Sequence, residues 1–82
     1  MNRKDIEEKY PDVPFLFADG FDKAIIGVSR TFNKISVAYD MNKCIRILMD
    51  RHEITQLEAI EDFEYNTIGS NVGKYTPTFI IK

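Results

Sequence analysis

Two stretches of the chain combine residue types and spacing that could support binding chemistry. In the first, between positions 53 and 64, every charged residue is acidic, and the candidate protein-binding residues are Glu58, Glu61, Asp62 and Glu64. Carboxylates along one helix could mimic nucleic acid or dock on a basic partner. The alternative is an ordinary solvated helix face, with acids near the helix start favoured by the positive end of the helix dipole.

The second stretch runs from Gly69 to Pro77 and combines two glycines with hydroxyl residues and a lysine. Such a loop could bind an anion through its backbone N–H groups and through the positive charge of its lysine. Its candidate ligand-binding residues are Ser70, Asn71, Gly73, Lys74, Tyr75 and Thr76. The segment is not a P-loop, because Tyr75 stands where Ser or Thr is required and no strand-then-helix order surrounds it. The alternative is a glycine-permitted reversal that leads into a final strand.

Other reactive side chains give weaker signals. Asp19, Asp22 and Asp40 could meet across a sheet, but their spacing fits no calcium-binding loop and Asp is common in turns. We expect Cys44 in the core and His52 at a helix end or on the surface. The sequence contains no catalytic triad order and no nucleotide fingerprint. We therefore expect no enzymatic activity, no cofactor and no metal.

Length and composition restrict the class of protein. The chain has 82 residues, of which 44% are hydrophobic, and this predicts a single domain over residues 1–82 with its own core. A net charge of -2 argues against duplex DNA or an anionic membrane as the main partner. The short apolar runs predict neither a membrane span nor a signal peptide, and hence a cytoplasmic location.

The first half of the chain has mainly β periodicity. A charged segment over residues 3–9 could form a short helix, with Asn2 as its N-cap and Tyr10-Pro11 as its end. Strands are then expected over residues 15–18, 23–31 and 35–40, joined by turns at Asp19-Gly20 and Asn33-Lys34. We expect these three strands to form an antiparallel meander.

The periodicity changes to helical after residue 40. Cys44, Ile45, Leu48 and Met49 share one face of a first helix. Thr55 and Glu58 form a capping-box signature at the start of a second helix, whose apolar stripe is expected to contain Leu57, Ile60 and Phe63. A last strand is expected over residues 76–82. The predicted fold is therefore α+β, a small antiparallel sheet in β-β-β-α-α-β order with both helices packed on one face.

The chain contains six Phe and four Tyr, which is a large number for so short a domain. A small domain buries a smaller share of its surface than a large one. We therefore expect some aromatic side chains to remain on the surface, where they would serve a homo-oligomer or a partner interface.

Several segments together resemble a group of small uncharacterised proteins encoded by tailed bacteriophages. They are residues 19–28 (DGFDKAIIGV), 39–45, 58–66 and the closing pattern Gly69-x-x-x-Gly73-x-x-Thr76-Pro77-x-Phe79. The resemblance implies an accessory protein that acts in the host cytoplasm and counteracts a host defence or host factor by binding a protein. It transfers no site residues, because no activity is known for the group.

An alternative function follows from the loop. Where the similar phage proteins carry a small Ala and an acid, this chain has Ser70 and Lys74, which favours an anionic ligand. The protein would then be an oligomeric sponge that sequesters a nucleotide-derived immune signal through residues 69–77.

Overall fold

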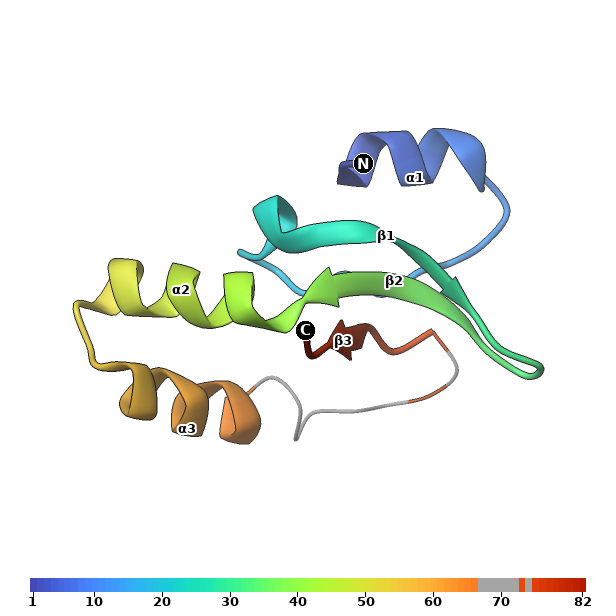
Figure 1. The fold of residues 1–82 in the computed structure, drawn as a ribbon. Coiled ribbons are helices and arrows are strands. Elements are labelled where there is room, and N and C mark those ends of the chain that lie inside the picture. Colours follow the sequence, from blue (N-terminus) through green and yellow to red (C-terminus); the bar gives the residue numbers. More distant parts are fainter. Residues whose placement is uncertain (67–72, 74) are drawn as a thin grey trace.

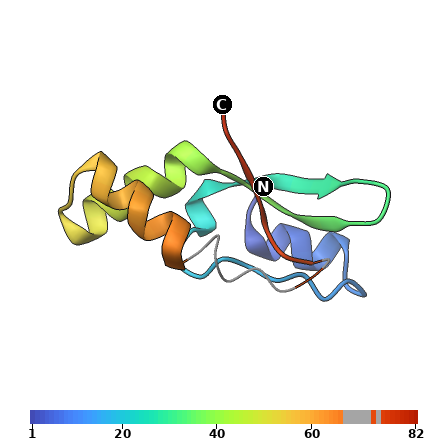
Figure 2. The same cartoon turned by 90° about the horizontal axis from the view of Figure 1, so that it is seen from below.

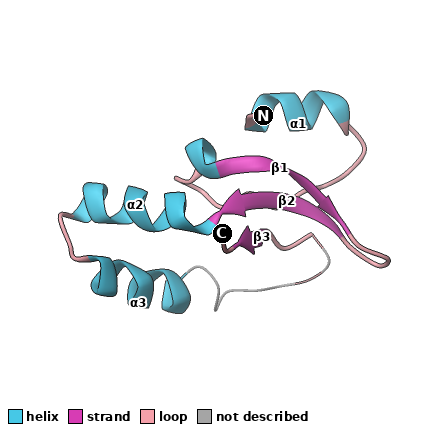
Figure 3. Cartoon of the chain, viewed as in Figure 1, coloured by secondary structure: helices cyan, strands magenta, loops and turns pink. Residues whose placement is uncertain are grey.

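Three strands and three α-helices make up the fold in the computed structural model, which describes residues 1–66, 73 and 75–82 (Figures 1 and 3). In chain order the elements are α1 (Arg3–Lys9), a single 3₁₀ turn η1 (Asp22–Ala24), β1 (Ile25–Arg30), β2 (Ile35–Asp40), α2 (Met41–His52), α3 (Gln56–Asn66) and β3 (Thr78–Ile80). This confirms the predicted α+β class and the order of elements from β1 onward.

β1 and β2 form an antiparallel hairpin, as predicted. Arg30 pairs with Ile35 at its tip, where the Thr31 backbone N–H donates to the Lys34 carbonyl oxygen at 2.7 Å. β2 is the central strand and is buried on both faces, so that even Ser36 is enclosed. The Ser36 hydroxyl lies 2.7 Å from the Thr78 hydroxyl of β3, which satisfies its hydrogen-bonding capacity.

β3 corrects the predicted antiparallel sheet, because it pairs with β2 in parallel, with Ala38 opposite Thr78 and Asp40 opposite Ile80. The reason lies in the connection. β2 leads directly into α2, and α3 then runs back along α2, which returns the chain toward the beginning of β2 (Figure 1). A crossover of this kind joins parallel strands, whereas a tight hairpin turn joins antiparallel ones.

The predicted strand over residues 15–18 is wrong, although the segment packs against the core. Its backbone groups do not join the sheet. The Ala18 N–H donates to the Tyr39 hydroxyl at 2.8 Å, and the Leu16 N–H donates to the Tyr75 carbonyl at 3.4 Å. The apolar run therefore lies against the core with Phe15, Phe17 and Ala18 partly buried and Leu16 exposed, and its N–H groups donate to a side chain, to another loop and, at Phe15, to the nearby Val13 carbonyl.

The ends of α1 and α2 follow local signals in the sequence. Asn2 and Asp5 form a reciprocal capping box at the start of α1, with bonds of 2.9 and 3.3 Å, and Tyr10 is the C-cap. Asp40 caps α2 by accepting the Lys43 N–H at 3.3 Å. At the other end of α2, Glu53 adopts the left-handed conformation, with a φ of 52°, and reverses the chain toward α3.

The helices are placed differently from the expectation that both would cover one face of the sheet. α2 and α3 form an antiparallel hairpin that extends beyond the end of the sheet (Figure 1). α1 and the segment before β1 instead lie on one side of the strands (Figure 2). No helix in the described part of the chain is long and apolar enough to cross a membrane.

An aromatic cluster joins the helical hairpin to the sheet. The Phe63 ring of α3 stands edge-on to Phe21 at 5.7 Å and to Phe79 at 4.8 Å, measured between ring centroids. Phe79 of β3 lies in turn 5.4 Å from the Tyr39 ring of β2. Aromatic pairs of this geometry stabilise a core beyond the burial of their area. The cluster therefore determines which side of α3 faces inward.

Candidate functional site

The inner side of α3 is determined by the core. Ala59 and Phe63 are four residues apart, which places them on one side of the helix, and both have 0% of their surface exposed. With 3.6 residues per turn, positions 57, 58, 61, 64 and 65 then fall on the opposite side of the helix. We call this surface the outer face of α3; it consists of Leu57, Glu58, Glu61, Glu64 and Tyr65.

The structure brings three of the four predicted acidic residues together on the outer face. Glu58, Glu61 and Glu64 are all exposed. Asp62 is not part of this group, because it is partly buried and accepts a hydrogen bond from the Asn66 side-chain amide at 2.6 Å. Its role is therefore local to the last turn of α3.

Two large apolar residues on the outer face were not predicted. The expectation that Leu57 belongs to the buried stripe of α3 is wrong, since 66% of its surface is exposed, and Tyr65 is 84% exposed. Their positions relative to Glu61 follow the i, i+4, i+8 pattern, so Leu57, Glu61 and Tyr65 form one line along the helix. That spacing is the signal in the sequence that could have identified them.

The predicted capping box at the start of α3 is confirmed. Glu58 Oε1 accepts the Thr55 backbone N–H and the Thr55 hydroxyl, both at 3.0 Å, while the Thr55 hydroxyl oxygen accepts the Glu58 N–H at 3.2 Å. The bond from the Thr55 backbone lowers the pKa of the Glu58 carboxyl, and the bond from the hydroxyl lowers it further. Glu58 is thus held in its charged form.

The described part of the chain supplies no cationic partner to the other two carboxylates of the outer face. Within residues 1–66, 73 and 75–82, no Lys, Arg or His side chain forms a salt bridge with Glu61 or Glu64. Together with Glu58 they make the outer face uniformly negative around two exposed apolar side chains. Such a surface suits a partner that supplies positive charge and an apolar pocket.

The second predicted site is described only in part, because Ser70, Asn71 and Lys74 lie outside the described residues. Gly73 has a φ of 137°, a conformation that L side chains rarely adopt, and its carbonyl accepts the Thr76 N–H at 3.2 Å. This supports a glycine-permitted reversal at Gly73.

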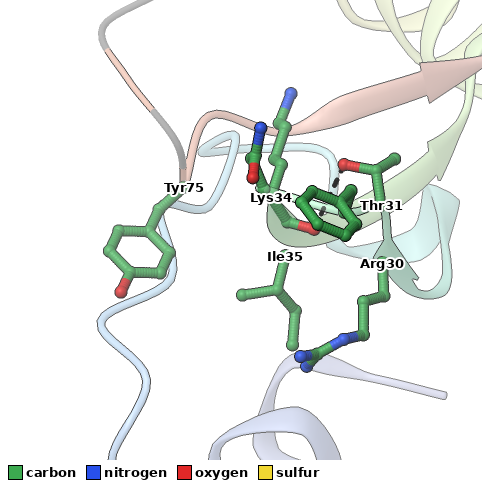
Figure 4. A pocket seen from close by; sticks show the side chains of 7 residues that line it. Arg30, Thr31, Lys34, Ile35 and Tyr75 are labelled. Atoms are coloured by element: carbon green, nitrogen blue, oxygen red, sulfur yellow. Dashed lines mark hydrogen bonds between the residues drawn. The ribbon is translucent and has the colours of Figure 1, made fainter.

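Tyr75, from the same loop, helps to line a cavity at the tip of the β1–β2 hairpin (Figure 4). We call it the hairpin-tip cavity; it has a volume of about 220 Å³ and is lined by Arg30, Thr31, Phe32, Asn33, Lys34, Ile35 and Tyr75. The structure therefore places the predicted Tyr75 in the lining of the same cavity as two cations, Arg30 and Lys34, that the sequence did not indicate.

The three aspartates considered for a metal belong to different elements, and Asp22 is the first residue of η1. Asp19 lies 3.7 Å from Arg3, and Asp40 caps α2 and lies 3.7 Å from the Lys82 ammonium. Among the described residues, no group of His, Cys, Asp and Glu side chains is arranged to hold a metal ion.

Cys44 and His52 occupy the predicted environments. Cys44 is fully buried among apolar side chains, and this burial, reinforced by the charge of Asp40, raises the pKa of its thiol to about 12. A thiol that stays protonated is a poor nucleophile, and Cys44 is therefore a structural residue. His52 is exposed and is the last residue of α2.

Comparison of the chain with protein-family models, with curated proteins and with solved structures finds no match. The outer face of α3 and the hairpin-tip cavity are therefore interpreted from their own geometry and chemistry.

Proposed function

We propose that the protein is a non-enzymatic accessory protein that docks the outer face of α3 on a positively charged surface of a host protein. In keeping with its resemblance to small phage proteins, this contact counteracts a host factor or host defence. The observation that carries the proposal is the exposure of Leu57 and Tyr65, at 66% and 84%, in line with Glu61, which forms no salt bridge with any of the residues that the structure describes.

The composition of the outer face supports binding to a protein. Interfaces draw most of their energy from a few central residues, among which Tyr is enriched, and surround them with a polar rim. Tyr65 and Leu57 would fill apolar pockets of the partner, and Glu58, Glu61 and Glu64 would face its Lys and Arg side chains. Complementary charge of this kind accelerates association and selects the partner.

The fold itself gives no other reason for these side chains. Leu57 and Tyr65 belong neither to the buried core nor to the apolar side chains packed against it. An exposed apolar side chain contributes little to folding, whereas a group of them on a charged surface is typical of an interaction site.

The proposal can be tested by capture of the partner from host lysate with matched variants. Tyr65→Ala removes the aromatic anchor, and Glu61→Lys/Glu64→Lys reverses the charge of the outer face while leaving the Thr55–Glu58 capping box intact. Glu8→Lys/Asp50→Lys makes the same change in net charge at exposed positions on α1 and α2.

We expect the wild type and the Glu8/Asp50 control to retain a stoichiometric partner that both outer-face variants lose. Retention should also fall as ionic strength rises, because salt screens exposed charges. Retention of the partner by Tyr65→Ala and by Glu61→Lys/Glu64→Lys would overturn the proposal, as would recovery of no stoichiometric partner.

A further inference from the structure

The hairpin-tip cavity lies at the opposite end of the molecule from the α2–α3 hairpin (Figure 1). Its lining comes from two segments that are far apart in the sequence: the β1–β2 hairpin supplies residues 30–35, and the loop before β3 supplies Tyr75. Figure 4 shows the Ile35 side chain between Tyr75 on one side and Arg30 on the other. The lining therefore has an aromatic side at Tyr75 and a cationic side at Arg30, with the apolar Ile35 between them.

The charged side chains that line the cavity, Arg30 and Lys34, are both cations. Within the described residues, neither Arg30 nor Lys34 forms a salt bridge with a carboxylate. The lining contains no acid, and neither does the sequence from 67 to 82. A guanidinium offers a planar fork of donors that matches the oxygens of a phosphate, and an ammonium adds a point charge.

Aromatic rings complete the recognition surface. Phe32, at the hairpin tip, is 100% exposed, and Tyr75 is partly buried. Rings at such positions stack on planar bases, which makes them common in nucleotide-binding surfaces. Phe32 contributes nothing to the core, so a stacking role explains why a large apolar ring stands at this tip.

We infer that the hairpin-tip cavity binds a nucleoside phosphate, with its phosphate at Arg30 and Lys34 and its base stacked on Tyr75 and Phe32. The size of the cavity limits the ligand. At about 220 Å³ it is smaller than a typical drug-sized pocket, which starts at roughly 300 Å³. A single nucleotide unit therefore fits better than an extended ligand.

The charged ends of Arg30 and Lys34 must approach each other before both can contact one phosphate. In Figure 4 the Arg30 and Lys34 side chains extend in different directions from the hairpin. Arg30 is exposed and Lys34 is partly buried. The exposed Arg30 side chain exchanges rotamers in picoseconds to nanoseconds, so its guanidinium can move toward a phosphate that is bound at Lys34.

The test is a titration of isotope-labelled protein with 5′-AMP, followed through its amide resonances, with inorganic phosphate and adenosine as separate probes. We expect saturable shifts confined to residues 30–35 and the neighbourhood of Tyr75. 5′-AMP should bind at least about tenfold more tightly than inorganic phosphate or adenosine, because it contacts both the cations and the aromatic rings of the cavity.

Substitutions test the cationic and the aromatic residues of the cavity separately. Arg30→Gln/Lys34→Gln should weaken 5′-AMP binding by at least about tenfold, which corresponds to about 1.4 kcal/mol. Tyr75→Leu should reduce the preference for 5′-AMP over inorganic phosphate, and Phe32→Leu/Tyr75→Leu should abolish it. Lys4→Gln/Lys43→Gln removes two exposed cations elsewhere and should leave the affinity within about twofold.

Three results would overturn the inference. One is the absence of saturable shifts at the hairpin, with far-UV circular dichroism confirming that the protein is folded. Another is an equal loss of affinity in the Lys4/Lys43 control, which would indicate nonspecific attraction of anions. The last is tighter binding of a single-stranded oligonucleotide, with shifts extending well beyond the hairpin, which would indicate a groove for a polymer. The outer-face variants of α3 should not affect any of these titrations.

Discussion

Each side of α3 carries one large aromatic residue, but the two residues have opposite environments. On the inner side Phe63 is fully buried and its ring contacts two other aromatic rings. On the outer face Tyr65, only two positions further along the helix, is 84% exposed. Since a two-residue step turns a helix by about 200°, position alone separates a core residue from a surface one. The comparison shows that packing in the core accounts for the inner side, whereas we propose binding as the reason for the apolar residues of the outer face.

The largest expected effect tests the inner side. Phe63→Ala removes both ring contacts and leaves a cavity between α3 and β3. We expect the free energy of unfolding to fall by about 3–5 kcal/mol, measured by urea titration with far-UV circular dichroism. A loss below about 1 kcal/mol would mean that Phe63 does not join the helical hairpin to the sheet.

A substitution at the N-cap of α3 should have an intermediate effect on the free energy of unfolding, because the cap stabilises the helix as a whole. Thr55→Ala removes the hydroxyl that accepts the Glu58 N–H at 3.2 Å. The loss of this cap should reduce the free energy of unfolding by about 0.5–2 kcal/mol in the same urea titration.

The pH dependence of stability tests the role of the Glu58 carboxylate in this cap. The pKa of Glu58 is lowered from 4.5 in the folded protein, so its ionised form binds Thr55 more favourably than its protonated form does. Its contribution is fully present above pH 4.5 and is lost as the pH falls through the lower folded value. The stability gap between wild type and Thr55→Ala should therefore narrow on acidification. A gap that widens in acid would contradict the role of the carboxylate.

The smallest effect on stability is expected on the outer face. Leu57→Ala and Tyr65→Ala should each change the free energy of unfolding by no more than about 0.5 kcal/mol, because both side chains are already exposed. The same substitutions should weaken partner capture. Destabilisation comparable to that of Phe63→Ala would show that the outer face belongs to the fold and would remove the contrast between the two sides.

Features encoded over three or four residues could be predicted from the sequence. The N-cap at Asn2 and the capping box of Thr55 with Glu58 are examples, since the groups that form each cap lie within one helical turn. The alternation in β2 and the apolar face of α2 were likewise visible, because each depends on the period of one element.

The buried side of α3 was predicted less well, because Leu57, Ile60 and Phe63 suggested a stripe by their size. The structure centres the buried side on Ala59 and Phe63 instead. A small residue such as Ala gives a weak hydrophobic signal, although its size is what allows a close approach to the core. The exposed position of Leu57 on the outer face was not predicted for the same reason.

Features that depend on the tertiary fold could not be predicted. The extended segment at 15–18 forms its backbone bonds with the Tyr39 hydroxyl and the Tyr75 carbonyl, and nothing local in the sequence specifies those partners. The hairpin-tip cavity depends in the same way on the return of Tyr75 to the β1–β2 hairpin. Whether copies of the chain associate stays a prediction.

The parallel pairing of β3 also has a consequence for how the chain folds. Ala38 meets Thr78 forty positions further along the chain, whereas the β1–β2 and α2–α3 hairpins are closed by short connections. Contacts between distant positions form slowly, because the intervening chain must first lose much of its freedom. We expect both hairpins to form early and β3 to dock last. Until Phe79 arrives, the rings of Tyr39 and Phe63 lack that cover, and this intermediate is the species most prone to aggregation.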